Sequence, residues 1–166
     1  RPKSLSNDNS LTHDVIVYEW EKQKKKKYNP EIVVTLQPTS PLRNSKHITY
    51  ALKKLIANRK SDSLVSCVKV PHNFVPESLM KIKNDFLIDT EFSKKILNRK
   101  EKPIYFARNG AAIYATKERI LKKCLYNENT IPFEMKFSES IDIDDENDLE
   151  IASLLFKQKI NYEKSD

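Results

Sequence analysis

The feature that most constrains the fold is an almost unbroken run of β-branched and apolar residues at positions 31–37, which stops at Pro38. A run of this kind is typical of a strand that is covered on both faces. After Ser45 the apolar residues recur at helical spacing, which predicts an amphipathic helix, and a second apolar run at 63–70 predicts another buried strand. Strand, loop, helix and strand in this order are typical of a right-handed crossover between parallel strands. We therefore expect an α/β fold with a Rossmann-like, mostly parallel sheet flanked by helices.

Further elements are expected on either side of this unit. Residues 12–27 end in a run of lysines, the polarity that a helix dipole favours, and are predicted to be helical. Residues 71–106 mix short apolar pieces with the turn residues Asn84 and Asp85, which predicts a small insertion that carries a hairpin. Shorter elements are predicted as strands at 104–106 and 111–115, a helix at 117–125, an alternating segment at 140–144 and a C-terminal helix from Glu146. The chain is thus expected to be one domain, 1–166, with its insertion at about 71–106.

The composition narrows the functional classes. The chain has 166 residues and a single glycine, where an average chain of this length has about 12, so it cannot form a glycine-rich phosphate loop by itself. A net charge of +7 suits anionic partners, but nucleic acid is not expected because the lysine run has no interleaved aromatic residues and no second basic cluster. Two distant cysteines exclude a disulfide framework or a zinc cluster, and no apolar run is long enough for a membrane span. We expect a soluble, cytoplasmic protein with no membrane partner.

Three segments carry candidate chemistry, because ligands of open α/β sheets bind where loops leave the strands. The first, residues 36–43, is a proline-stiffened loop suited to a sugar or phosphate ligand, or simply to a rigid turn. The second holds Asp142 and Asp144, two carboxylates on one side of an extended segment, which suit Mg²⁺ when phosphates complete its shell. The alternative is that the acids of this segment cap and complement the following helix. The third joins Arg99 to residues 108–114, which contain the lone glycine, and a tight hairpin turn is its alternative.

In order and spacing these segments resemble the acylneuraminate cytidylyltransferases, the CMP-sialic acid synthetases. The resemblance is carried by Arg-Pro-x-x-Leu-Ser-x-Asp at 1–8, Leu-Gln-Pro-Thr-Ser-Pro-Leu-Arg at 36–43, Arg-Asn-Gly with Ile-Tyr at 108–114, and Ser-Ile-Asp-Ile-Asp at 140–144. It implies transfer of CMP from CTP to the anomeric hydroxyl of an acylated nonulosonate, such as sialic, legionaminic or a related acid, with release of pyrophosphate. The implied cofactor is Mg²⁺. The implied partners are CTP, the nonulosonic acid sugar and a second copy of the chain in a homodimer, which the hairpin-bearing insertion would form.

The resemblance also implies roles for individual residues. Asp142 and Asp144 would be the catalytic pair that holds Mg²⁺. The implied substrate-binding residues are Gln37, Thr39, Ser40, Arg99, Asn109, Gly110 and Tyr114. The implied nucleotide-binding residues are Arg1 and Thr12.

Two differences from the family bear on what the chain does. Its Asn-Gly turn, which begins at Asn109, is one residue longer than the commonest form. The family also begins with a strand and a basic phosphate-binding loop, for which this sequence has no counterpart. We therefore expect an N-terminally truncated form that turns over CTP poorly or not at all by itself. The alternative is a non-catalytic binding or assembly module derived from a nucleotidyltransferase.

Overall fold

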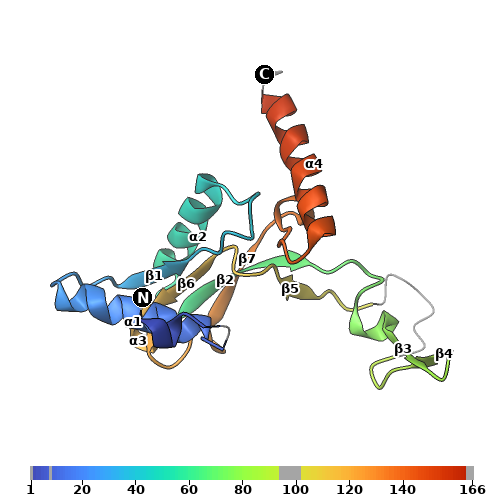
Figure 1. The fold of residues 1–166 in the computed structure, drawn as a ribbon, viewed down its shortest axis with the longest axis horizontal. Helices are drawn as coiled ribbons and strands as arrows, with labels where there is room; N and C mark the ends of the chain where they lie inside the picture. The colour runs from blue at the N-terminus through green and yellow to red at the C-terminus, as the bar shows by residue number, and fades with distance from the viewer. Residues whose placement is uncertain (1, 8, 94–101, 164–166) are drawn as a thin grey trace.

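A computed structural model describes residues 2–7, 9–93 and 102–163 of the chain. Its centre is a five-stranded open sheet in which β6 lies between β1 and β2 (Figure 1). The strands are β1 (Ile32–Thr35), β2 (Ser63–Lys69), β5 (Phe106–Arg108), β6 (Tyr114–Lys117) and β7 (Thr130–Glu134). β6 pairs antiparallel with both β1 and β2, β5 pairs antiparallel with β2, and β7 pairs parallel with β2. The expectation of a Rossmann-like, mostly parallel sheet is therefore wrong.

The prediction placed β1 and β2 correctly in the sequence but was wrong about which strand lies beside them in the sheet. Because β1 and β2 are both antiparallel to β6, they run parallel to each other, as a crossover connection requires. They are not adjacent, however, since β6 is inserted between them from later in the chain. An apolar run reports that both faces of a strand are covered, and it carries no information on the direction of the strands beside it.

Four helices accompany the sheet in the described part of the chain: α1 (Thr12–Lys25), α2 (Ser45–Ala57), α3 (Glu118–Leu121) and α4 (Glu146–Glu163). The crossover helix α2 is capped at its N-terminus by Asn44, whose side chain accepts a hydrogen bond from the backbone N–H of His47. Its apolar stripe packs into the main core, and the fully buried residues of that cluster are Ala51, Leu55, Leu64, Ile113 and Ala115. The amphipathic helix and the strands predicted on either side of it are confirmed; β2 is mostly buried as expected, whereas β1 is only half-buried.

A second, two-stranded sheet stands apart from this core. It consists of β3 (Met80–Lys83) and β4 (Phe86–Asp89), and Figure 1 draws it away from the larger sheet, beyond the segment that follows β2. The turn residues Asn84 and Asp85 have positive φ values of 50° and 65°, the conformation that favours a two-residue hairpin loop. All residues of both strands are exposed. The predicted hairpin in the insertion is confirmed.

Short 3₁₀ turns and the last helix complete the described chain. The turns are η1 (Lys3–Leu5), η2 (Pro76–Ser78) and η4 (Phe137–Glu139). Helix α4 buries Ala152 and points away from the sheet (Figure 1). Among the described helices, none combines the length and the apolar character that a membrane crossing would need.

Candidate functional site

The site is organised by a break in one edge of the central sheet. Strands β5 and β6 lie along the same edge of β2, with Arg108 opposite Cys67 and Tyr114 opposite Val65. Residues 109–113 therefore bulge out opposite the single residue Ser66. An inserted stretch of this kind bends a strand and turns its side chains in new directions. The longer Asn-Gly turn of the sequence is accommodated in this bulge.

The serine opposite the bulge holds it in place. The backbone N–H of Ser66 donates to the carbonyl of Ile113 at 2.9 Å, and its hydroxyl accepts from the Ile113 N–H, also at 2.9 Å. Both residues are fully buried, so each of these hydrogen bonds satisfies a group that water cannot reach. The far end of the bulge is thereby fixed to the central strand.

The proline-stiffened loop that follows β1 binds the outer side of the same bulge. Gln37 uses both its backbone and its side chain on Ala111: its N–H donates to the Ala111 carbonyl at 3.0 Å, and its Oε1 accepts from the Ala111 N–H at 3.2 Å. Arg43 donates to the carbonyls of Gln37 and Ala112, each at 2.9 Å. Arg43 therefore clamps the loop to the bulge, and Gln37 is held in a fixed orientation.

The segment before α4, residues 140–143, contacts both the proline-stiffened loop and the bulge. The N–H of Ile143 donates to the carbonyl of Thr39 at 2.9 Å, and Asn109 Nδ2 donates to Ser140 Oγ at 3.0 Å. Gly110 has a φ of +64°, a conformation that glycine adopts most readily, and a Cβ built on it would clash with the carboxylate of Asp142. A larger residue at this position would force that carboxylate to move. The three segments that the sequence singled out thus meet at one point.

The two candidate metal ligands have different surroundings. Asp142 is half-buried, whereas Asp144 is exposed. Residues 140–144 form no strand, so the extended segment expected there from the alternating sequence is wrong. Asp145 Oδ1 accepts from the Asp148 N–H at 3.0 Å at the start of α4, and Asp148 Oδ2 accepts from the Asp144 N–H at 3.0 Å. The helix-capping interpretation is therefore confirmed for Asp145 and not for the two candidate ligands.

Several buried polar atoms at this meeting point lack a partner within the described residues. They are Asp142 Oδ1, Asn109 Oδ1 and Ser40 Oγ. Unpaired buried acceptors are uncommon and indicate an unfilled role, for which a bound ion or ligand is one explanation. No cluster of three or more His, Cys, Asp or Glu side chains suited to a metal occurs in the described ranges. A cation held here would need oxygen ligands from a substrate to complete its shell.

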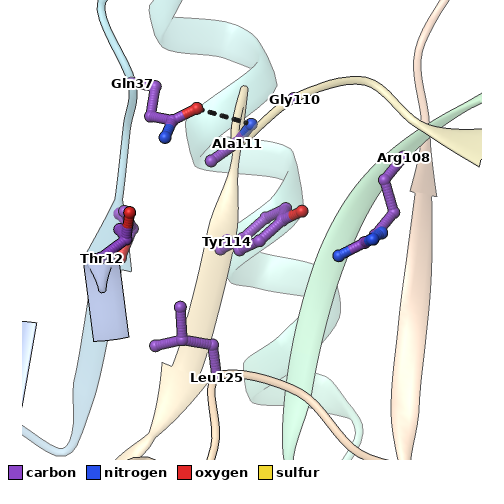
Figure 2. Close-up of a pocket in the computed structure, with 8 residues that line it drawn as sticks. Thr12, Gln37, Arg108, Gly110, Ala111, Tyr114 and Leu125 are labelled. Carbon is purple, nitrogen blue, oxygen red and sulfur yellow. Dashed lines mark hydrogen bonds between the residues drawn. The ribbon is translucent and has the colours of Figure 1, made fainter. Parts of the chain in front are cut away.

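A pocket of about 430 Å³ opens beside the bulge (Figure 2). Its lining residues are Thr12, Thr35, Gln37, Arg108, Gly110, Ala111, Tyr114 and Leu125. The pocket therefore collects four of the predicted site residues, namely Thr12 from α1, Gln37 from the loop, Gly110 from the bulge and Tyr114 from β6. Thr39, Ser40, Asn109 and the two aspartates do not line it. Thr39 of the loop and Asn109 of the bulge hydrogen-bond to the segment before α4, and Asp142 of that segment approaches Gly110. Arg1 and Arg99 lie outside the described residues.

Four pocket residues were not among the predicted site residues, and Arg108 is the charged one; the others are Thr35, Ala111 and Leu125. The Arg108 guanidinium donates to the hydroxyl of Tyr126 and lies 5.1 Å from the centroid of its ring. The rings of Tyr126 and Tyr114 meet edge to face at 5.8 Å. Burial raises the pKa of Tyr114, while Arg108 opposes that shift. The only sequence signal for Arg108 was its position directly before the Asn-Gly turn.

Comparison with known proteins gives the following similarity. No protein-family model matches the chain. The whole chain aligns with an N-acylneuraminate cytidylyltransferase of Escherichia coli O18:K1:H7 (strain RS218 / NMEC), with 29% identity over 176 aligned positions. The chain spans 38% of the length of that relative. This similarity supports a distant relationship to that protein.

Proposed function

We propose that this chain forms the sugar-acid side of a nucleotidyltransferase that moves CMP from CTP to the anomeric hydroxyl of an acylated nonulosonate, releasing pyrophosphate. The observation that carries the proposal is the contact of Gly110 with Asp142 beside the pocket that holds Gln37 and Tyr114. These residues come from three distant parts of the sequence. The relative's name supports the reaction type, and a cytoplasmic location stays a prediction.

The residues present fit a bound Mg²⁺. Asp142 offers a buried carboxylate oxygen without a partner among the described residues, and Asp144 follows two positions later with an exposed carboxylate. Hard carboxylate oxygens are the ligands that Mg²⁺ takes together with substrate phosphates. When bound, the ion would neutralise charge on the phosphates of CTP.

The protein's own part in this proposal is binding and orientation. The carboxamide of Gln37 is fixed by Ala111 and faces the pocket beside the Thr12 hydroxyl, so both can hydrogen-bond a sugar. The ring of Tyr114 forms an apolar wall with Val65 and Ala111. Holding a hydroxyl group close to the phosphorus that it attacks replaces a bimolecular encounter with a unimolecular step.

The test is pyrophosphate release from CTP with Mg²⁺ and a panel of nonulosonic acids. It is run on the polypeptide as its gene encodes it and on the 166-residue chain. In the active form, Asp142→Ala is expected to lower turnover by about 100-fold or more, because a lost metal ligand removes charge stabilisation at the phosphates. Asp89→Ala, an exposed aspartate of β4, is the matched control and is expected to stay within about twofold of the parent protein. Absence of release with every sugar acid, in both forms, contradicts the proposal.

We also propose that the hairpin β3–β4 joins two copies of the chain into a homodimer. Ile82 and Leu87 face each other across the hairpin and are 78% and 66% exposed. An isolated two-stranded hairpin is marginally stable in water, and this one has apolar side chains on both faces. A second copy brings an identical apolar surface, and a twofold axis lets both copies use the same residues.

Analytical ultracentrifugation tests the homodimer. The parent protein is expected to sediment as a dimer at about 10–100 µM, a range typical of modest interfaces. Ile82→Lys together with Leu87→Lys is expected to give a monomer. Ile56→Lys, on the exposed side of α2, is the control and should leave the dimer intact. A monomeric parent protein, or dimeric double variant, rules out this interface.

A further inference from the structure

Arg108 is the only charged side chain among the described residues that line the pocket. The rest of the lining is neutral: hydroxyls and an amide on the side of Thr12 and Gln37, and apolar or aromatic groups on the side of Leu125 and Tyr114. Figure 2 draws the guanidinium beside the Tyr114 ring, across the pocket from Thr12. A ligand that fills this pocket therefore meets one positive charge, at one end.

The charge on Arg108 has no anionic partner in the described part of the chain. No carboxylate there forms an ion pair with it, although other arginine and lysine side chains do form such pairs, for example Arg119 with Asp62 at 2.6 Å. Its neighbours are two tyrosines: it donates to the Tyr126 hydroxyl and interacts electrostatically with Tyr114. A guanidinium has five N–H donors in a planar fork, so most of them remain available to a ligand.

The tyrosines give the guanidinium a fixed direction. Tyr126 contacts it both through the hydroxyl and through the face of the ring, whose centroid is 5.1 Å away. The edge-to-face contact of Tyr126 with Tyr114 links that arrangement to the buried part of the sheet. A side chain restrained in this way loses less conformational freedom when it binds a ligand.

We infer that Arg108 receives the anionic group of the pocket's ligand through paired N–H···O hydrogen bonds, and that Tyr126 is the residue that positions it. Two sources could supply that group if the proposed function holds, on which this inference rests: the carboxylate of a sugar acid or a phosphate of the nucleotide. Both present two oxygens in the geometry that the arginine fork matches. The lone positive charge then selects acidic ligands over neutral sugars of the same size.

Calorimetric titration with four ligands separates the two sources: N-acetylneuraminate, its methyl ester, CTP and cytidine. If the carboxylate is the partner, the parent protein binds the acid about 10-fold or more tightly than the ester, and Arg108→Gln reduces that ratio to about one. If a phosphate is the partner, the parent protein binds CTP more tightly than cytidine, and Arg108→Gln instead reduces the ratio of those two affinities to about one. Lys83→Gln, in the exposed strand β3, removes the same charge elsewhere and should leave both ratios unchanged.

Two further variants test the geometry. Arg108→Lys keeps the charge but lacks the fork, and we expect it to recover only part of the preference. Tyr126→Phe keeps the ring and loses the hydroxyl; it should weaken acid binding by about 3- to 10-fold and leave ester binding unchanged. A purely structural role for Tyr126 would weaken both ligands equally.

The outcomes separate this inference from the proposed function. Equal binding of charged and neutral ligands by the parent protein, or ratios that survive in Arg108→Gln, overturns the inference even if pyrophosphate release is observed. If Arg108→Gln abolishes one of the two affinity ratios but no pyrophosphate release is observed, the anion site is supported and the proposed transferase activity is contradicted.

Discussion

The central sheet and the hairpin β3–β4, called the arm below, contain similar apolar residues. These residues are buried in the sheet and exposed in the arm. Leu64 of β2 is fully buried, with β6 and β7 on its two edges and α2 packed above it. Leu87 of β4 has one neighbouring strand, and its side chain is 66% exposed. Apolar composition therefore does not by itself create a core; a strand needs covering elements on both faces. The proposed homodimer would cover the exposed apolar side chains of the arm.

Removing a core side chain from the sheet has the largest expected effect. Leu64→Ala should lower the free energy of unfolding by about 2–5 kcal/mol, since it loses buried apolar surface and leaves a cavity. Urea denaturation followed by circular dichroism measures it. A loss below about 1 kcal/mol would mean that the sheet tolerates removal of a buried side chain as well as the arm tolerates removal of an exposed one, which contradicts the difference described above.

The next effect comes from two positions with similar backbone conformations, one in each region. Gly110→Ala should cost about 2–4 kcal/mol and weaken ligand binding, because the new Cβ meets Asp142 and φ is +64°. Asn84 in the arm has a φ of 50°, so Asn84→Ala serves as the control. It should lower global stability by less than about 1 kcal/mol. Equal costs at the two positions would show that the Asp142 contact adds nothing.

A smaller effect depends on pH and belongs to the sheet region. Asn127 and Asn129 donate to Asp62 at 2.8 and 3.0 Å, Arg119 donates at 2.6 Å, and together they lower the pKa of Asp62 to about 2. Because this folded-state pKa lies below the unfolded value, the carboxylate stabilises the fold above about pH 4, and the stabilisation is lost as the pH falls toward 2.

We expect this loss to be about 1–2 kcal/mol after solvent screening. Urea denaturation at several pH values, with Asp62→Asn for comparison, measures it. The difference in stability between the parent and the variant should shrink steadily from pH 4 to pH 2. A difference that stays constant over that interval excludes Asp62 as the cause.

The smallest expected effect is in the arm. Leu87→Ala should change the free energy of unfolding of the monomer by less than about 0.5 kcal/mol, because the side chain is already exposed. Measurement at a protein concentration low enough to keep the chain monomeric isolates this value. A cost comparable to that of Leu64→Ala would mean that the arm packs against the body of the same chain.

The local elements could be predicted from sequence, whereas the strand order could not. The period of apolar residues reports which side of an element is covered, so α2, β1 and β2 were recognised. The neighbour of β1 is Tyr114–Lys117, far along the chain, and no local pattern announces that pairing. Strand β7 was missed because Pro132 and Glu134 interrupt its apolar run.

Part of the candidate site could likewise be predicted from sequence motifs, whereas part depends on how the strands pair. The loop containing Gln37 and the segment containing Asp142 were recognisable as motifs, and the structure brings them together. The role of Arg108 depends on the register of β5 and β6 along β2, which sets residues 109–113 opposite one serine. Register is a property of paired strands, so it was not accessible from the spacing of residues within one segment.

Over residues 63–67, strand β2 has hydrogen-bonded neighbours along both edges. Its amides can exchange with deuterium only when the whole sheet opens, whereas those at the outer edges of the arm are free to exchange from the native state. Deuterium uptake in β2 is therefore an internal reference for global unfolding. Any substitution or ligand that slows uptake at residues 109–113 but leaves β2 unchanged acts on the pocket alone.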